Sequence, residues 1–537
     1  MKQKIDNMIA KAIENGDFVG VNAGVYRDGE CIYLNSFGMA DKENNRPMTA
    51  DTIFRIYSMT KPVTAVAVMQ MVEQGKINTD FPVSWYLPEF SDMQVYDENG
   101  VARPAKNELR VKDLLNMTSG IPYPNCMNQT QRDVASFFGE MEERRDGQNP
   151  VDTMEFCRRI AQIPLEFEPS TKWEYGVSAD ILGGLVQNVS GMNYRDYLKT
   201  NIFEPLGMQD TDFYVPEEKQ NRFAQAYEFR DGKLVPDKEC HLGLNDYQTL
   251  PAFISGGAGL TSTIPDYARF ANTLANGGTS KDGVRILGKY ALDFLRTPQV
   301  MGERFTQDWD SLRGYSYGAL VRVLTDKAGA GTIANLGEFG WDGWTGTYIC
   351  ADPITKTVIL YFTQTSRKAH EKYCIWVSLM QRLQLVCPVC GEVRKIPQSP
   401  KNGFSDVAFD CAEWWSFQGE LPPLSEHIWE RLDILPTVGE IRIIRVTAPF
   451  DCGIGETFRM LFQPALSHFN GWDEHPEELE RSAIVECQFE KIIESDPCQA
   501  WISVKVISVT MLRDICKVYP SRKVPEWNHL FHAEKED

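Results

Sequence analysis

Residues 58–72 read SMTKPVTAVAVMQMV, and this stretch decides how the rest of the sequence is interpreted. The apolar run after Pro62 predicts a buried helix with Ser58 at its entrance and Lys61 one turn in. Residues three apart on a helix share a face, so the hydroxyl and the amine meet where the helix dipole is positive. A lysine in that field, among apolar neighbours, has a lowered pKa and can remove the hydroxyl proton. The stretch predicts a nucleophilic serine with a lysine base. Residues 58–61 taken alone also fit a plain helix N-cap followed by a solvated lysine.

Length, composition and charge narrow the classes of protein to consider. A chain of 537 residues is expected to form about two to four domains, and 43% apolar with 24% charged residues is an ordinary globular profile. The net charge of −19 argues against nucleic acid and against anionic membranes as partners. The sequence shows neither a signal-peptide pattern at its start nor an apolar stretch of bilayer-spanning length. We therefore expect a cytoplasmic enzyme.

The 13 cysteines follow no repeated framework, and most are expected to be reduced thiols. One C-x-x-C pair, Cys387 and Cys390, is typical of half a zinc site, and Cys411 follows at a suitable distance. Either His427 or Cys452 would have to complete the four ligands, because the chain has no second C-x-x-C. Plain thiols are therefore the favoured interpretation, and we expect no metal and no cofactor.

Residues 1–385 are predicted to form one domain of the α/β (α+β) class. One hairpin is predicted at 21–33, with the favoured turn dipeptide Asp28-Gly29, and a second at 344–362. Helices are predicted between them and after them, at 109–117, 180–189, 265–274 and 368–385. This order predicts an antiparallel sheet built from N- and C-terminal strands and flanked by helices. A helical lobe would leave a cleft beside the sheet.

Residues 386–537 are predicted to form a smaller, β-rich C-terminal domain of unknown role. Strands are expected at 439–446, 457–462, 483–489 and 500–509. The tryptophans of this part would either form a ligand-binding face or pack a small core, and core packing is the favoured reading. They are Trp414, Trp415, Trp429, Trp472, Trp501 and Trp527.

Two further motifs accompany the Ser58 stretch. Tyr175 precedes the helix predicted at 180–189, where its hydroxyl can exchange protons with a leaving group and where the Lys61 ammonium is expected to lower its pKa. Residues 340–347 read GWDGWTGT, and from Trp344 they open the strand of the second hairpin. Glycines at that edge allow close approach of a substrate, and a strand N–H there can bind an oxyanion. Taken singly, these motifs also fit a partly buried surface aromatic and a glycine-rich turn.

With all three motifs in this order, the sequence resembles the class C β-lactamase-like serine hydrolases, and within them the family VIII carboxylesterases, over about residues 5–385. Further stretches match landmarks of that family: VKDLLNMTSG at 111–120, IFEPLGM at 202–208 and GGAGLTST at 256–263. The resemblance implies a β-lactamase/transpeptidase-like fold without a cofactor.

The resemblance also implies a role for each candidate catalytic residue. Ser58 would be the acylated nucleophile and Lys61 its general-base partner, while Tyr175 would shuttle the proton. The backbone N–H groups of Ser58 and Trp344 would form the oxyanion hole. Water, or another acceptor, would then release the acyl group.

Departures from the β-lactamase pattern bear on the substrate, and they mark four residues as candidates for substrate binding. The Tyr-x-Asn motif ends here in Val177, so the amide that grips a β-lactam is missing. The Lys-Thr-Gly motif is replaced by Trp341, Asp342 and Gly343, which removes a cation and adds a carboxylate that would repel an anionic substrate unless it turns into solvent. Both changes resemble the esterase branch, so we expect an uncharged or weakly charged small acyl ester.

Other functions stay open at this point. An amide substrate would make the protein a D-aminopeptidase or a β-lactamase-type hydrolase, and an acceptor other than water would make it an acyltransferase. A protein of another class, an inactive binding or scaffold protein with the same fold, is disfavoured by the presence of Ser58, Lys61 and Tyr175. The sequence contains neither a G-x-S-x-G elbow nor an H-E-x-x-H pair. The natural substrate and the oligomeric state are left open.

Overall fold

The computed structural model describes residues 2–366, apart from 98, 148, 231–232, 239 and 301–311, and four strands in the rest of the chain. The chain divides into two compact units, which are described separately. The predicted boundary at 385/386, the helix predicted at 368–385 and the Cys387/Cys390 pair lie outside the described residues.

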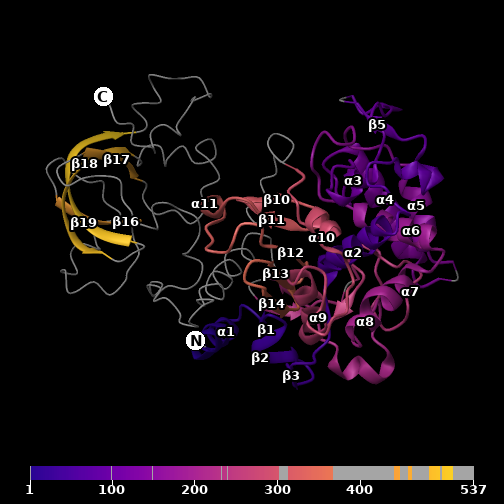
Figure 1. Cartoon of the computed structure of the whole chain (residues 1–537), viewed down its shortest axis with the longest axis horizontal. Helices are drawn as coiled ribbons and strands as arrows, with labels where there is room; N and C mark the ends of the chain where they lie inside the picture. Colours follow the sequence, from indigo (N-terminus) through magenta and orange to yellow (C-terminus); the bar gives the residue numbers. More distant parts are fainter. Residues whose placement is uncertain are drawn as a thin grey trace. The chain divides into compact units, whose positions relative to one another are not determined.

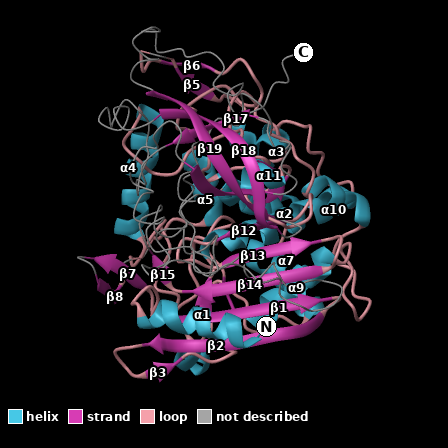
Figure 2. Cartoon of the chain, turned by 90° about the vertical axis from the view of Figure 1, so that its left-hand side faces the viewer, coloured by secondary structure: helices cyan, strands magenta, loops and turns pink. Residues whose placement is uncertain are grey.

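An eight-stranded antiparallel sheet forms the first unit's centre, with the strand order β10-β11-β12-β13-β14-β1-β2-β3. Figure 2 shows this order from β12 to β3. Its strands are β1 (Gly20–Arg27), β2 (Glu30–Asp41), β3 (Arg46–Pro47), β10 (Tyr315–Tyr317), β11 (Arg322–Leu324), β12 (Phe339–Asp342), β13 (Tyr348–Asp352) and β14 (Thr357–Thr363). Strands β1 and β14 pair in the middle, from Val21 opposite Thr363 to Arg27 opposite Thr357. The sheet is therefore assembled from the two ends of this unit, which confirms the predicted fold class.

The first predicted hairpin is confirmed. Asp28 and Gly29 connect β1 to β2 with φ angles of 51° and 79°. Two consecutive residues with positive φ make the tight turn whose twist matches that of the flanking strands.

The second hairpin begins later than predicted. Its first strand, β13, starts at Tyr348 instead of Trp344, because residues 343–347 fold into a turn between β12 and β13. The Gly343 N–H donates to the Thr347 carbonyl at 2.8 Å and closes this turn. The Gly-rich segment thus lies between two strands, which leaves Trp344 in a connection at the sheet's end.

Helices cover the sheet and form a separate lobe, which lies on the right of Figure 1. Helix α9 packs against β1, β13 and β14, and α1 packs against β2, while α3, α5 and α6 pack together in the lobe. The helices are α1 (Lys2–Glu14), α2 (Thr60–Glu73), α3 (Val111–Leu115), α4 (Gln129–Arg144), α5 (Thr153–Ile160), α6 (Ser178–Ser190), α7 (Tyr194–Leu198), α8 (Glu204–Leu206), α9 (Ile264–Ala275), α10 (Lys289–Leu295) and α11 (Lys327–Ala330). The helices predicted at 109–117, 180–189 and 265–274 correspond to α3, α6 and α9.

Helix α2 is the core of this unit. Every residue from Thr60 to Met71 is buried, so the helix is enclosed on all sides, as its apolar sequence predicts. Its neighbours are α6, α7 and α10 in the lobe and β12 in the sheet. Pro62 sits in the first turn, where its missing N–H leaves no helical hydrogen bond unmade. The start of α2 is therefore fixed between sheet and lobe.

Three small sheets complete the first unit, with the pairings β4-β9, β5-β6 and β15-β7-β8. Their strands are β4 (Phe54–Arg55), β5 (Gln94–Tyr96), β6 (Ala102–Pro104), β7 (Tyr227–Arg230), β8 (Lys233–Pro236), β9 (Thr261–Ser262) and β15 (Thr365–Ser366).

The second unit contains a four-stranded antiparallel sheet, with the order β16-β19-β18-β17. The strands are β16 (Ile441–Thr447), β17 (Thr457–Phe462), β18 (Ala483–Ser495) and β19 (Gln499–Met511). All four predicted strands are confirmed, and β18 is longer than predicted. Trp501 lies on β19, whereas the other tryptophans of this part lie outside the described residues.

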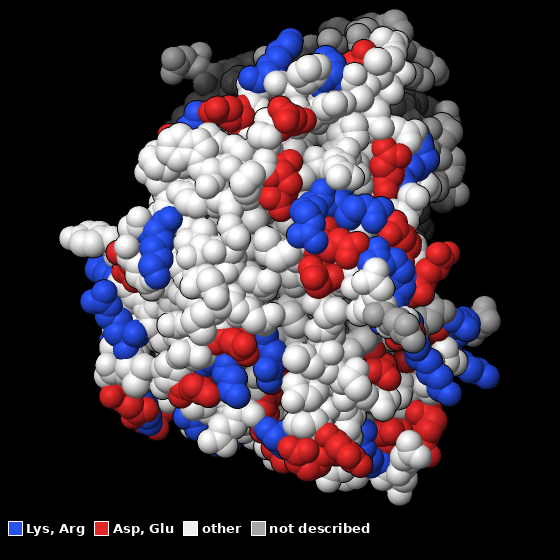
Figure 3. Space-filling model, turned by 90° about the vertical axis from the view of Figure 1, so that its right-hand side faces the viewer, with Lys and Arg blue, Asp and Glu red and all other residues white. Residues whose placement is uncertain are grey.

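Among the described residues, no helix has both the length and the apolar character needed to cross a bilayer. On the face shown in Figure 3, basic and acidic side chains lie next to one another. Ion pairs of this kind join Glu140 to Arg144 and Arg159, at 2.9 and 2.5 Å.

Candidate active site

Ser58 lies at the junction of strand β4 and helix α2, in the single turn of 3-10 helix Tyr57–Met59. Tyr57 has a φ of 41°, in the left-handed region that bulky residues seldom occupy, so the chain turns sharply just before Ser58. Met59, not Ser58, occupies the N-cap of α2, and no side chain makes a capping hydrogen bond there. The alternative reading of Ser58 as the N-cap is therefore wrong.

Lys61 is fully buried one turn into α2 and donates to three acceptors. Its Nζ lies 3.1 Å from Ser58 Oγ, 2.8 Å from the Tyr123 hydroxyl and 2.9 Å from the Gly257 carbonyl oxygen. Burial lowers the pKa of Lys61 to about 7, although nearby carboxylates oppose this effect. A lowered pKa of Lys61 is what the sequence predicts. With this pKa, a large fraction of the amine is unprotonated near neutral pH.

Tyr175 lies in the loop before α6, with its hydroxyl next to Ser58 and Trp341. Trp341 Nε1 donates to this hydroxyl at 2.9 Å, and the Ser58 side chain also hydrogen-bonds with it. The Tyr175 ring centroid is 4.7 Å from Lys61 Nζ. Burial nevertheless raises the pKa of Tyr175 well above its ordinary value, because desolvation outweighs both hydrogen bonds. The expectation of a lowered tyrosine pKa is wrong, whereas the predicted convergence of the three side chains is what the structure shows.

Sequence reasoning missed a second tyrosine, Tyr123. Its hydroxyl accepts the 2.8 Å hydrogen bond from Lys61 and also contacts the Ser58 side chain, while its ring packs 5.4 Å from that of Tyr175. The available signal was the sequence PYP at 122–124, directly after the matched landmark at 111–120. Two prolines restrict the backbone around the tyrosine and so aim its ring.

Trp344, the second predicted oxyanion donor, is carried by the turn between β12 and β13. Besides the hydrogen bond that closes this turn, Thr347 Oγ1 donates to the Ile56 carbonyl at 3.3 Å. A Cβ on Gly343 would lie 2.2 Å from Thr347 Oγ1 and 2.5 Å from Ile56 O, so only glycine fits there. The turn is therefore pressed against the chain that leads into Ser58.

The buried side chain of Gln364 hydrogen-bonds to both the turn at 343–347 and the chain that leads into Ser58. Its Nε2 donates to the Arg55 carbonyl and to Thr345 Oγ1, both at 2.9 Å, and its Oε1 accepts from the Arg55 N–H at 3.1 Å. One side chain thus ties the strand before Ser58 to the turn that carries Trp344.

The predicted substrate-binding residues differ in their exposure. Val177 and Trp341 are buried, at 0% and 2% exposed, so their direct contacts are with neighbouring side chains. Asp342 is half-buried, and its negative charge is one of the influences that raise the pKa of Lys61. Gly343 lies in the crowded turn just described.

The Beta-lactamase family model matches residues 5–376 of the chain. The chain belongs to this family. The predicted resemblance to class C β-lactamase-like hydrolases near the family VIII esterases is thereby confirmed.

Similar proteins include Esterase EstB of Burkholderia gladioli, 30% identical over 382 residues that make up 68% of this chain and 90% of EstB. A putative D-alanyl-D-alanine carboxypeptidase of Escherichia coli K12 is 27% identical over 68% of this chain and 82% of its own length. Among solved structures, the chain resembles EstCE1, a hydrolase with promiscuous acyltransferase activity, with a TM-score of 0.59 and 24% identity over 71% of this chain and 98% of EstCE1. The family and its esterase member support a serine hydrolase in general.

In this Beta-lactamase family member, a cavity of about 300 Å³ lies beside the candidate active site and reaches Tyr57, the residue before Ser58. Its lining includes Arg55, Tyr57, Phe223, His241 and Asp237. His241 stacks on the exposed Trp344 indole, with ring centroids 4.8 Å apart and planes inclined by 27°. The stacked pair marks where the cavity meets the turn that carries the predicted oxyanion donor.

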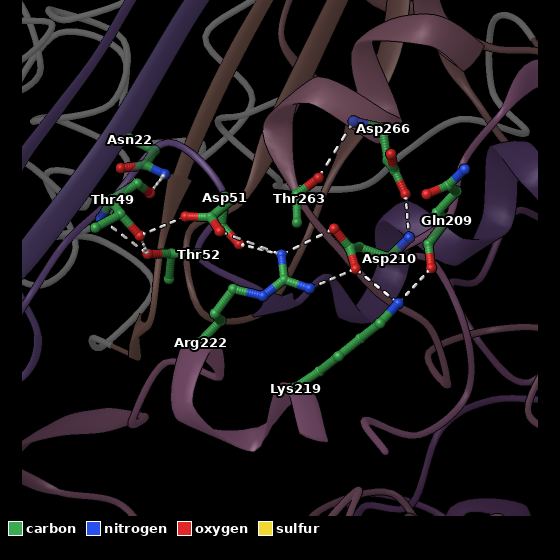
Figure 4. Close-up of polar contacts among 10 residues, drawn as sticks. All are labelled: Asn22, Thr49, Asp51, Thr52, Gln209, Asp210, Lys219, Arg222, Thr263 and Asp266. Carbon is green, nitrogen blue, oxygen red and sulfur yellow. Dashed lines mark hydrogen bonds and ion pairs between the residues drawn. The ribbon is translucent and has the colours of Figure 1, made fainter. Parts of the chain in front are cut away.

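An ion-pair network anchors one wall of this cavity (Figure 4). The Arg222 guanidinium grips the Asp210 carboxylate at 2.6 and 2.9 Å, and Lys219 Nζ reaches the same carboxylate at 2.8 Å. The Asp210 N–H in turn donates to Asp266 on α9 at 2.6 Å. Because Arg222 precedes the cavity residue Phe223, the network fixes this wall to the helix that covers the sheet.

Within the part of the chain that the structure describes, no three His, Cys, Asp or Glu side chains cluster in a way that would hold a metal ion. The candidate zinc ligands Cys387, Cys390 and Cys411 lie outside that part, so the interpretation of them as plain thiols stays a prediction.

Proposed function

We propose that this protein is a serine carboxylesterase that hydrolyses small, uncharged or weakly charged acyl esters through an acyl-enzyme on Ser58. The observation that carries the proposal is the 3.1 Å hydrogen bond between Ser58 Oγ and the buried Lys61 amine. A serine hydroxyl becomes a useful nucleophile only with a base in contact, and a lysine with a pKa of about 7 serves as that base near neutral pH.

The proposed reaction follows from the contacts around Ser58. Neutral Lys61 takes the Ser58 proton as Oγ attacks the ester carbonyl, and the resulting oxyanion is held by the N–H groups of Ser58 and Trp344, each worth about 3–4 kcal/mol. Burial raises the pKa of Tyr175, so Tyr175 keeps its proton in the resting site. It donates that proton to the departing alcohol and recovers one from protonated Lys61, which returns the lysine to its neutral form. Water then attacks the acyl-enzyme by the reverse sequence of proton transfers.

The test of this proposal is turnover of a short-chain p-nitrophenyl ester by wild type and by Ser58→Ala. The variant should lose nearly all activity, and a fluorophosphonate probe should label wild type at Ser58, as read by mass spectrometry. Activity that survives the substitution would rule out Ser58 as the nucleophile. An unlabelled, inactive wild type would favour the scaffold alternative.

The replacement of Lys-Thr-Gly by Trp341, Asp342 and Gly343 favours an ester over a β-lactam or a D-alanyl peptide. The first position is tryptophan, which is uncharged and offers no cation to a substrate carboxylate. Its Nε1 already donates to the Tyr175 hydroxyl. Turnover of nitrocefin or D-Ala-D-Ala in the absence of ester turnover would instead favour the β-lactam or the D-alanyl peptide as substrate.

Transfer of the acyl group to an alcohol or amine is a second candidate, since EstCE1 carries that activity beside hydrolysis. Adding an alcohol acceptor to the ester assay should show whether the transferred product competes with the free acid. The cytoplasmic location, the small-molecule substrate and the lack of nucleic-acid or membrane partners stay predictions from the sequence.

A further inference from the structure

Asp180 is a buried carboxylate that the proposed reaction does not use. It lies in the first turn of α6, a favourable place for a negative charge, and only 3% of it is exposed. Its Oδ1 accepts hydrogen bonds from Ser255 Oγ at 2.5 Å and from the Gly257 N–H at 3.0 Å. Burying a charge without partners is costly, so this placement calls for an explanation.

The peptide groups of Gly257 connect Asp180 to the active site. The N–H of this residue donates to Asp180, and its carbonyl oxygen accepts the 2.9 Å hydrogen bond from Lys61 Nζ. A single residue therefore separates the carboxylate from the amine that contacts Ser58.

Packing holds this connecting residue in place. A Cβ on Gly257 would lie 2.7 Å from Asp180 Oδ2, so the backbone comes as close to the carboxylate as glycine allows. At the preceding residue, Thr64 Oγ1 of α2 donates to the Gly256 carbonyl at 2.5 Å. The segment is thus fixed between α6 and α2, and Asp180 acts on Lys61 through a rigid link.

Among the described residues, few charged or acidic groups surround Asp180 and Lys61. Lys61 faces the carboxylates of Asp180 and Asp342, and of these two Asp180 raises the pKa of Lys61 more. The Tyr123 hydroxyl also accepts a hydrogen bond from the amine, and the Tyr175 ring lies over it, with its centroid 4.7 Å away. Groups near Asp180 on other elements are Cys157 of α5 and Tyr194 of α7. Burial raises the pKa of Asp180 itself, while the Ser255 hydrogen bond and the charge of Lys61 act in the opposite direction.

We propose that Asp180 is a positioning residue for Lys61: it holds the Gly257 carbonyl on the amine, and its negative charge sets the pH range in which that amine becomes an unprotonated base. This inference rests on the proposed function.

Asp180→Asn tests the inference, because an asparagine oxygen can still accept both hydrogen bonds while the charge is lost. Without the carboxylate, the protonated form of Lys61 is less stable. The acid limb of kcat/KM for the p-nitrophenyl ester should therefore move to lower pH, by about one unit for a charge at this range. A folded variant whose acid limb coincides with that of wild type would overturn the inference.

Asp113→Asn is the matched control. Asp113 is also a buried carboxylate, 1% exposed, but its partners are Ser170, Thr118 and the Arg110 N–H. Its substitution should lower thermal stability and leave the acid limb in place.

Ser255→Ala is the second test variant, to be used if Asp180→Asn does not fold. Removing one donor weakens the charged form of Asp180, so the acid limb should shift in the same direction by a smaller amount. A limb that stays in place or moves to higher pH would count against the inference. Ester turnover that persists in Ser58→Ala would instead overturn the proposed function, so the two failures are distinguishable.

Discussion

Trp341 Nε1 donates a hydrogen bond of 2.9 Å to the Tyr175 hydroxyl, which joins strand β12 to the loop before α6. The tryptophan that stands in place of the family's lysine thus orients the tyrosine of the other substituted motif. The contact therefore links the replaced Lys-Thr-Gly motif to the tyrosine that the Tyr-x-Val motif keeps.

Trp341→Phe should therefore impair the proposed chemistry more than binding. Losing a hydrogen bond to a group that gains charge during proton transfer costs about 1.5–3 kcal/mol, or roughly 10- to 150-fold in kcat for the p-nitrophenyl ester. Tyr317→Phe is a suitable control. Tyr317 packs edge-on against Trp341 at 5.1 Å, and its buried hydroxyl has no partner among the described residues. An equal loss in both variants would trace the effect to general packing of this aromatic cluster.

The pH dependence should report Lys61. With a pKa of about 7, the amine is protonated below that pH and free above it, so kcat/KM should rise with pH through about 7. A pH–rate profile measured from about pH 3 to about pH 9 checks this. An acid limb near pH 4, where a carboxylate titrates, would contradict the assignment of the base.

The same lysine should make stability depend on pH. Its pKa is about 7 in the folded protein against an ordinary value of 10.5, so the unfolded chain binds more protons between these two values. The free energy of unfolding should then rise as the pH increases from about 7 towards 10, before other groups intervene. In Lys61→Met, denaturant titrations should show this rise diminished.

Gly343→Ala should displace the turn that carries Trp344. The added methyl would meet Thr347 Oγ1 at 2.2 Å, so the turn must move away from Ser58, and we expect kcat to fall by about 100-fold, the cost of losing one oxyanion donor. Gly139→Ala is the control. Gly139 lies inside α4, where the added Cβ would meet nothing within 4 Å beyond its chain neighbours and the helix's own backbone. Helix propensity predicts a gain of about 0.5–1 kcal/mol in stability with normal kcat.

Trp344→Ala should separate side chain from backbone. The proposed oxyanion contact uses the backbone N–H, which remains, while the stack on His241 is lost. We expect KM to rise several-fold with kcat within about threefold of wild type. A collapse of kcat with unchanged KM would show that the indole itself holds the turn.

Arg222→Met should lower stability by about 1–3 kcal/mol, because Asp210 would lose its bidentate partner in the network of Figure 4. Urea unfolding would measure the loss. Lys281→Met removes an exposed pair with Glu30 and should leave the urea midpoint almost unchanged.

The sequence was sufficient for the features that depend on local pattern. The apolar run after Pro62, the Asp28-Gly29 turn and the alternating strands of the second unit all formed as predicted. The features it could not supply depend on contacts between distant segments. The glycine-rich stretch at 343–347 forms a turn because it packs against Ile56, which lies almost three hundred residues earlier in the chain.

The pKa shifts also divide into one that local sequence predicts and one that depends on contacts between distant segments. The lowered pKa of Lys61 follows from its apolar neighbours in sequence, whereas the raised pKa of Tyr175 depends on how deeply its loop is covered. Tyr123 was missed because the PYP sequence marks the tyrosine but does not place its hydroxyl beside Lys61, a contact that only the folded chain makes.

The pairing of β1 with β14 joins residues that the ribosome makes far apart in time. The first strand must wait for nearly the whole unit to be synthesised before its partner emerges, and such distant pairings form slowly. Until then the turn carrying Trp344 has no sheet to hold it beside Ser58. A nascent or prematurely terminated chain should therefore have no hydrolytic activity. Activity should appear only after β14, the last strand of the sheet, has been synthesised.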